Sequence, residues 1–209
     1  PDLSDIGSVN QTPILYSEVG SSTPFQTMID SLTATPVETS GAVVVIAEFI
    51  VVCGEGGTFQ WNDGADFTTW PEDNFYQLGT SKFIYGSPVR SGQSPSALFW
   101  SLSGTAIGTI DAAGTGINFA YVSTRTTVMS AKSIVSYDPL FYWVGTDCFW
   151  VYNGACQELP NLQNKKWFFD NINPDQRGKT YAYVNTQWNE LWVCFCKGDA
   201  TEPNWSVVH

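Results

Sequence analysis

One pattern recurs four times along the chain: a hydrophobic strand, a tight turn rich in Gly, Asn or Asp, and a second strand of alternating character. If Phe49, Leu98, Phe141 and Trp192 are equivalent positions, successive copies are separated by 49, 43 and 51 residues. This period is typical of repeats that each form one multi-stranded propeller blade. A single blade cannot bury both of its faces, so neighbouring copies must stack. The repeat therefore predicts an all-β fold, an antiparallel β-propeller-like array of short-stranded blades with long surface loops.

The residue content agrees with short strands joined by tight turns. Aromatic residues make up 15% of the chain, which also contains 18 Gly and 11 Pro. With 43% hydrophobic and 14% charged residues among 209, the chain can bury a substantial core. The stretch that follows the strand at 149–152 shows no helix start or stop signal, so we expect its polar residues to form a loop.

The composition changes near residue 40. Residues 1–40 are rich in Ser, Thr and Pro and predict an extended N-terminal lead-in, with one short strand near Ile14–Tyr16. Residues 41–209 hold all four copies of the repeat and predict one β-propeller-like domain. Because the chain opens at Pro1 without an initiator Met, we expect it to be a fragment of a longer protein or to have a trimmed start.

The charge of the chain limits its partners. The formal net charge is −11 and the sequence pI is near 4.2. Adhesion to nucleic acid or to an anionic membrane requires Lys and Arg, so neither is expected. No run reaches the roughly 18 apolar residues that would span a bilayer. An acidic surface does suit a wall that DNA must pass without sticking.

The cysteines do not predict a metal site or a cofactor. The chain has five Cys without CxxC spacing, and its one His stands at the last position. Zinc sites need four ligands in recognisable spacing, so a metal site is not expected. We expect the thiols to be reduced, and no cofactor is predicted.

A cluster of carboxylates invites comparison with glycosidases. Asp63, Asp66, Glu72 and Asp73 lie in the segment 61–74, "WNDGADFTTWPEDN", which also holds two tryptophans. Asp-Gly and Pro-Glu-Asp-Asn are also ordinary turn sequences, and this second interpretation is favoured. The terminal position of the only His argues against a Ser-His-Asp triad. We therefore expect the protein not to be an enzyme.

The C-terminal half carries a more specific pattern. An aromatic strand ends in Tyr152 and Gly154, and a later strand reads "NELWVCF". With the segments around them, these residues resemble the β-propeller region of tail nozzle or tail-hub proteins, the packaged-DNA stabilisation type, of short-tailed bacteriophages. The resemblance extends over about residues 41–209. The other matching elements are Glu158-Leu159-Pro160, Phe169, Asn171-Ile172-Asn173, Asp175-Gln176, Asn189, Glu190 and Trp192.

The resemblance implies a structural virion protein of the viral tail, made in the bacterial host cytoplasm. Such a protein forms part of the tail tube or nozzle through which double-stranded DNA is retained and then ejected. By resemblance, its partners are further copies of itself in a ring, with a hexamer as the expected form. Tail adaptor or portal-side proteins and distal tail or fibre proteins are the other expected partners. Double-stranded DNA is expected only as a passing, weakly contacted cargo, and a membrane is not expected.

Two surface sites are predicted. The segment after residue 158 places Lys165, Lys166, Trp167, Phe168 and Phe169 together, and we expect these residues to contact a neighbouring subunit from a surface loop. In the other interpretation, the three rings fold back onto their own blade.

An alternative function is also open. A carbohydrate-binding, lectin-like β-propeller or a receptor-binding tail module would use Trp61 and Trp70 to stack on sugars, whereas in the simpler interpretation these rings attach their loop to its blade. A propeller hydrolase would instead need converging carboxylates at a central opening.

Overall fold

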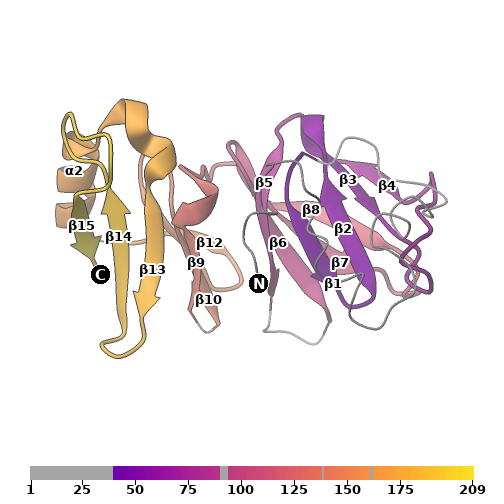
Figure 1. Cartoon of the computed structure of the whole chain (residues 1–209). Coiled ribbons are helices and arrows are strands. Elements are labelled where there is room, and N and C mark those ends of the chain that lie inside the picture. The colour runs from indigo at the N-terminus through magenta and orange to yellow at the C-terminus, as the bar shows by residue number, and fades with distance from the viewer. Residues whose placement is uncertain (1–39, 90–93, 138, 161) are drawn as a thin grey trace, which may run out of the picture.

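The computed structural model describes residues 40–89, 94–137, 139–160 and 162–209. These residues form four small antiparallel sheets that follow one another along the chain, here named sheets I to IV (Figure 1). The expected lead-in at 1–40, including the strand near Ile14–Tyr16, lies outside the described residues except for residue 40. No helix in the described part is long and apolar enough to cross a membrane.

Each sheet is a simple meander in which consecutive strands are hydrogen-bonded neighbours. Sheet I contains β1 Val43–Ile46, β2 Phe49–Cys53, β3 Thr58–Trp61 and β4 Phe75–Gln77, and sheet II contains β5 Phe83–Val89, β6 Ser96–Ser101, β7 Gly104–Ile110 and β8 Ile117–Ser123. Sheet III contains β9 Ile134–Tyr137, β10 Leu140–Val144, β11 Phe149–Tyr152 and β12 Cys156–Glu158, and sheet IV contains β13 Tyr181–Asn185, β14 Glu190–Phe195 and β15 Trp205–Val208.

The fourfold repeat is confirmed as four sheets. The positions chosen as equivalent from the sequence, Phe49, Leu98, Phe141 and Trp192, all fall in the second strand of their sheet. A hairpin joins β11 to β12 through residues 153–155, since Tyr152 pairs with Cys156 and Gly154 adopts a φ of 103° that favours glycine.

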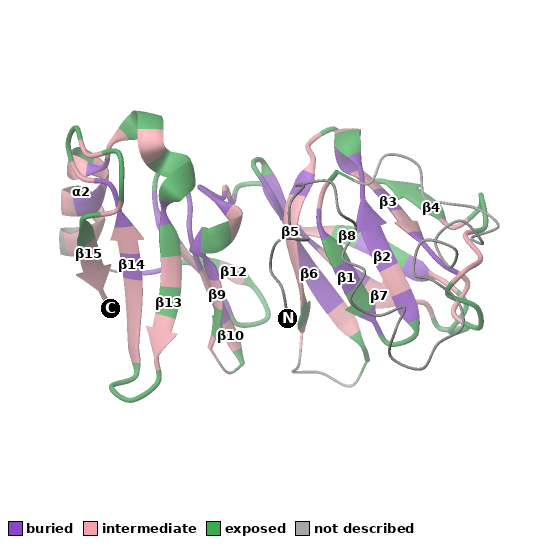
Figure 2. Ribbon diagram, in the orientation of Figure 1, coloured by how far each residue is buried: buried purple, intermediate pink, exposed green. Residues whose placement is uncertain are grey.

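Sheets I and II pack directly against each other. Phe59 of β3 lies at the centre of this interface, with its ring centroid 4.0 Å from that of Phe119, 4.7 Å from Phe83 and 5.1 Å from Phe99. Gly86 of β5 allows the two sheets to approach closely, because a Cβ atom there would lie 2.3 Å from Val44 Cγ2. Figure 2 shows the resulting buried stripe along β1, β2 and β6.

Sheets II and III meet through a second cluster of large side chains. Leu98 and Trp100 of β6 pack with Phe141 and Trp143 of β10. The Trp100 ring centroid lies 5.5 Å from that of Phe141 and 5.8 Å from that of Trp143. This contact joins the two halves of the molecule into one array.

A helix completes the interface between sheets III and IV. Helix α2, Leu162–Asn171, follows β12 and places Phe168 between Phe149 of β11 and Phe195 of β14, at centroid distances of 5.2 and 4.6 Å. The expectation of a loop in this segment is therefore wrong. Phe168 and Ile172 are both buried and stand four residues apart, so tertiary packing on one face stabilises a helix whose ends carry weak signals.

The array is open. Sheets I and IV lie at its two ends, and within the described residues neither packs against the other (Figure 1). The described residues are mostly antiparallel β-structure with few helices, and their sheets do not close into a ring, so a closed propeller stays a prediction.

Candidate functional site

The segment expected to present three rings to a neighbouring subunit is helix α2. Phe168 is fully buried in its own core, while Trp167 and Phe169 are half-buried against the same cluster. Trp167 also packs on Trp205 of β15, with ring centroids 5.6 Å apart. The expectation of three exposed rings on a loop is wrong, and the interpretation in which they fold back onto their own chain describes the structure. The physical reason is the gap between sheets III and IV, which these rings fill.

The two lysines of this segment remain near the surface. Lys165 forms an ion pair with Glu158, and this contact raises the pKa of Lys165. Lys166 Nζ lies 2.6 Å from Asp170 Oδ2, one helical turn away, with its side chain 80% exposed. Of the five residues in the segment, Lys166 is thus the most accessible, and a contact of Lys165 or Lys166 with a neighbouring subunit stays a prediction.

The two tryptophans that the alternative function would use to stack on sugars differ in burial. Trp61 belongs to β3, is only 6% exposed and packs on Phe119 at a centroid distance of 5.7 Å. Its ring therefore has no face open to a ligand. Trp70 is half-buried. The interpretation that Trp61 attaches the loop to its sheet agrees with this burial.

The carboxylates of the same loop hold its turns. Asp66 Oδ1 accepts hydrogen bonds from Thr68 Oγ1 and N at 2.7 and 2.9 Å, and Asp66 Oδ2 accepts one from Thr69 Oγ1 at 2.9 Å. These bonds lower the pKa of Asp66. Asp63 Oδ1 accepts from the Ala65 N–H at 3.0 Å. Both side chains are thus engaged in turn geometry, as the favoured interpretation of the sequence proposed.

Three of the five thiols are poorly suited to nucleophilic chemistry. Burial raises the pKa of Cys53 and of Cys148 to about 12, with Asp147 contributing at Cys148, and burial raises the pKa of Cys156 to about 11. Such thiols are protonated at neutral pH. All five cysteines are free. In the described ranges, no group of three His, Cys, Asp or Glu side chains could hold a metal ion.

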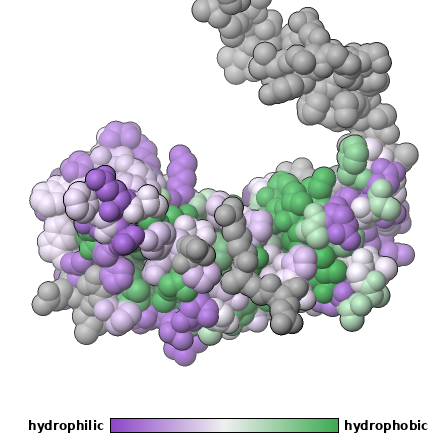
Figure 3. All heavy atoms as spheres, turned by 90° about the horizontal axis from the view of Figure 1, so that it is seen from below, coloured by the Kyte–Doolittle hydropathy of each residue, from purple (hydrophilic) through white to green (hydrophobic). Residues whose placement is uncertain are grey.

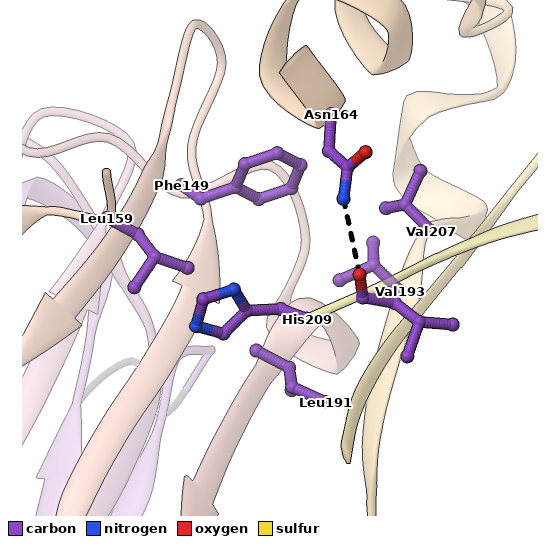
Figure 4. Close-up of a pocket in the computed structure, with 8 residues that line it drawn as sticks. Phe149, Leu159, Asn164, Leu191, Val193, Val207 and His209 are labelled. Carbon is purple, nitrogen blue, oxygen red and sulfur yellow. Dashed lines mark hydrogen bonds between the residues drawn. The ribbon is translucent and has the colours of Figure 1, made fainter. Parts of the chain in front are cut away.

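A cavity lies between sheets III and IV beneath α2 (Figure 4). It is lined mainly by Phe149, Leu159, Val193 and Val207, with His209 at one end, and Asn164 Nδ2 donates to the Val208 carbonyl oxygen at 3.2 Å. Its volume is about 20 Å³, enough for about one water molecule and far below that of a ligand pocket. This cavity is a packing defect of the interface.

The outer face of sheet IV carries a row of aromatic side chains. Tyr181 and Tyr183 of β13 lie beside Trp192 of β14, and Tyr181 and Tyr183 are 39% and 43% exposed. The ring centroids of Tyr181 and Tyr183 are 6.4 Å apart and those of Tyr183 and Trp192 are 6.0 Å apart, with each pair within about 25° of parallel. A shallow open depression continues from Tyr181 past Cys194 to Trp205. We name this surface the aromatic face.

The outer face of sheet I is aliphatic. Val43 and Val45 of β1 are 62% and 54% exposed, and they pair across the sheet with Val52 and Ile50 of β2. Phe75 of β4 lies on the same side and is 45% exposed. Figure 3, which views the molecule from below, shows hydrophobic residues concentrated on the half that holds sheets I and II. Val52 is buried and Ile50 is half-buried, so the exposed part of this side consists of Val43, Val45 and Phe75, and we name it the aliphatic face.

Sequence reasoning missed both end faces. The alternation in "TYAYVN" predicts that Tyr181 and Tyr183 share one face, but it does not say whether a neighbouring sheet covers that face. The run "AVVVIA" indicates a hydrophobic strand, but it does not show that the residues of β1 alternate between exposed and buried. Only the order of the sheets shows which faces lie at the ends.

The comparisons with known proteins add no relative. No protein-family model matches the chain, and no curated protein matches it.

Proposed function

We propose that the chain is a structural subunit of a bacteriophage tail, forming part of the tube or nozzle through which double-stranded DNA is retained and then ejected. The observation that carries this proposal is the open stack of four sheets, in which the outward sides of the two end sheets expose Val43 and Val45 of sheet I and Tyr181 and Tyr183 of sheet IV. An apolar face of this kind requires further protein to cover it. A wall assembled from repeated units meets that requirement. The resemblance of residues 41–209 to nozzle and tail-hub proteins supports the same function.

The arrangement of first strands supports a propeller-like order of the sheets in the assembled wall. The first strands of sheets I and II lie side by side, and the Ala42 N–H, just before β1, donates to the Phe83 carbonyl oxygen of β5 at 2.9 Å. The first strands of sheets III and IV, β9 and β13, are also neighbours. Blades around a common axis bring their first strands together in this manner. In the proposed wall, each chain contributes four such blades.

Charge supports passage of DNA without adhesion. The chain has 20 Asp and Glu against nine Lys and Arg. Four lysines form ion pairs with carboxylates, which reduces their availability to phosphate; these are Lys82, Lys165, Lys166 and Lys179. Each remaining phosphate contact would be weakened by salt. We place DNA as passing cargo, further copies of the chain in a ring, and tail adaptor and distal tail or fibre proteins as neighbours in the virion tail.

The test is electron microscopy of the purified full chain together with a duplex-DNA binding assay. We expect annular particles with a pore wide enough for duplex DNA, and no detectable binding to duplex DNA at about 0.15 M salt, where the Debye length is about 8 Å. Particles without a pore would overturn the proposal. Micromolar DNA binding that is abolished by Lys165→Glu with Lys166→Glu would overturn it as well, because it would indicate a DNA clamp.

A further inference from the structure

We propose that the free edge of strand β8 pairs with the β8 edge of a second copy of the chain, so that two copies of sheet II join into one continuous antiparallel sheet. The two β8 strands run in opposite directions about a twofold axis. A contact of this kind joins two copies only, so it differs from the head-to-tail contact that closes a ring. The inference therefore goes beyond the proposed tail-wall function and does not depend on it.

Strand β8 is the last strand of sheet II, and its backbone is hydrogen-bonded on one side only. It pairs with β7 along its length, and within the described ranges no backbone hydrogen bond joins it to any other strand. The row of N–H and C=O groups on its other side is thus left without a strand partner. Backbone groups of this kind are a template for pairing with a further strand.

The ladder with β7 shows which backbone groups form this free row. The Asp111 N–H donates to the Gly116 carbonyl oxygen at 2.9 Å, so these two residues form a hydrogen-bonded pair. Hydrogen-bonded and non-hydrogen-bonded pairs alternate along an antiparallel ladder. It follows that Asn118 and Ala120 bond to β7. The residues whose N–H and C=O groups point away from β7 are Ile117, Phe119 and Tyr121.

The other outer edges carry features that discourage pairing with a further strand. Strands β4 and β12 have only three residues each, and β12 ends in the charged Glu158. Strand β15 has four residues and is covered in part by α2, since Asn164 Nδ2 donates to the Val208 carbonyl oxygen at 3.2 Å. Short length, charge and a covering helix are the usual means by which proteins protect sheet edges.

Strand β8 has none of these features over most of its length. Its seven residues, "INFAYVS", include no charged residue and no Pro. The irregularity in its pairing with β7 lies near its C-terminal end, so residues 117–121 form a regular ladder. A longer, uncharged and regular edge is the kind of edge to which a strand from another molecule adds.

The sequence of β8 fits a second copy of itself. In an antiparallel pair centred on Ala120, Phe119 of each copy lies opposite Tyr121 of the other, and both residues direct their backbone groups outward. These two residues can exchange both of their backbone hydrogen bonds, at two places related by the twofold axis. Ala120 then faces its equivalent at a non-hydrogen-bonded position, where Cα atoms lie only about 4.5 Å apart and a small side chain fits.

The charges at the two ends of β8 are opposite. Residues 112–137 contain no Asp or Glu, although the chain as a whole has a net charge of −11. The antiparallel register places Arg125, just after β8, beside the β7–β8 turn of the second copy, where Thr115 donates hydrogen bonds to the Asp111 carboxylate. Neither Asp111 nor Arg125 forms a salt bridge within the described part of the chain. The remaining acidic residues of two copies repel each other, so we expect a weak dimer.

Hydrogen exchange of the full chain tests the pairing directly. NMR measures the exchange rate of the Phe119 amide, which points away from β7, at low and at high micromolar concentration. We expect this exchange to slow as the dimer forms, because the amide gains a partner. The Ala120 amide, which is bonded to β7, is the internal control and should be protected at both concentrations. Light scattering during size-exclusion chromatography measures the mass.

Two variants test the register. Ala120→Lys brings two ammonium groups together at the twofold axis, and Arg125→Glu removes the attraction to Asp111. Both positions are exposed, so each variant should fold, which circular dichroism verifies. We expect Ala120→Lys to raise the dissociation constant of the dimer by about tenfold or more, and Arg125→Glu by about threefold. Val43→Lys is the matched control and should change nothing, because Val43 is 62% exposed on a strand of another sheet.

Other outcomes overturn the inference. A wild type that stays monomeric at every concentration contradicts it, and so does a dimer in which exchange of the Phe119 amide is as fast as in the monomer. Protection of this amide in the monomer would show that another part of the same chain covers the edge. A dimer that Ala120→Lys leaves intact places the contact on a different surface. Rings that form without protection of Phe119 would exclude the edge pairing and leave the tail-wall proposal standing.

Discussion

The interface between sheets I and II differs from the interface between sheets III and IV in what fills the space between the sheets. In the first, the ring of Phe59 lies against three other phenylalanine rings, and no other element is inserted. In the second, α2 adds Phe168 to the space between the sheets, and a cavity of about 20 Å³ remains. A repeated strand pattern thus specifies the sheets without specifying how closely their faces approach.

Glycine accounts for part of the difference. In sheet II, a Cβ atom at Gly86 would lie 2.3 Å from Val44 Cγ2, and one at Gly108 would lie 2.9 Å from Phe119 Cε1. Both glycines allow bulky neighbours to reach the sheet surface. On the facing surfaces of sheets III and IV, β10, β11, β13 and β14 contain no glycine, so larger side chains hold the sheets apart and α2 fills the space.

The largest expected effect is the loss of free energy of unfolding when the central ring of each interface is removed. Phe59→Ala and Phe168→Ala both remove a fully buried ring, a change that costs about 3–5 kcal/mol. We expect Phe59→Ala near the upper end, because two sheets cannot easily collapse onto the cavity. Phe168→Ala should lie near the lower end, since a helix can shift and since Ala is favoured over Phe in helices by roughly 0.5 kcal/mol.

Urea denaturation of both variants measures these free energies of unfolding. Leu102→Ala is the control for each, because Leu102 is 60% exposed and its truncation should change the free energy little. A greater loss for Phe168→Ala than for Phe59→Ala would show that the helix, and not the direct sheet contact, is the more rigid part of the array.

The next largest effect on stability is expected from substitutions that add side-chain volume at each interface. Gly86→Ala forces a methyl group against Val44 and Phe99, and we expect it to destabilise the protein by about 1–3 kcal/mol. Val193→Ile adds one methylene beside the cavity that Val193 lines, so it should be neutral or stabilise the protein by about 0.5 kcal/mol. Thermal denaturation followed by circular dichroism compares the two. A stabilised Gly86→Ala variant would contradict the close approach of sheets I and II.

Much of the fold could be predicted because strand alternation and turn residues are local signals. The spacing of Phe49, Leu98 and Trp192 identified second strands, and each of these side chains points toward the following side of its sheet. Phe141 points toward the preceding sheet instead, so its true equivalent is Tyr142. A shift of one residue reverses the face of a strand, and local sequence does not show which face a neighbour covers.

The helix and the end faces could not be predicted for a related reason. Helix α2 is stabilised by the burial of Phe168 and Ile172 between two sheets, and its sequence has weak capping signals. The exposure of Val45 and Tyr183 follows from their position at the ends of the stack. Both features depend on contacts between segments distant in sequence, and the interpretation of Trp167, Phe168 and Phe169 as exposed rings was wrong for that reason.

The smallest expected effect concerns one ion pair at each end of the array. The hydrogen bond from Lys82, with a second from Ser40, lowers the pKa of Glu55, and the hydrogen bond to Glu158 raises the pKa of Lys165. A lowered carboxyl pKa contributes stability at higher pH that is lost as pH falls through the folded-state value. A raised ammonium pKa contributes stability at lower pH that is lost as pH rises through the folded-state value.

The two pairs should therefore respond at opposite limits of pH. Lys82→Met is expected to reduce the loss of stability on acidification below about pH 4.5, and Lys165→Met to reduce the loss on alkalinisation above about pH 10.5. Near neutral pH, Lys165→Met should cost well below about 1 kcal/mol, because the pair is partly exposed and screened by salt. Urea denaturation at pH values from 3 to 11 measures the free energy of unfolding in both the acidic and the alkaline range. If Lys165→Met altered the stability at acidic pH as strongly as at alkaline pH, the ion pair with Glu158 would be coupled to the packing of α2. The two ends of the array would then differ in electrostatics as well as in packing.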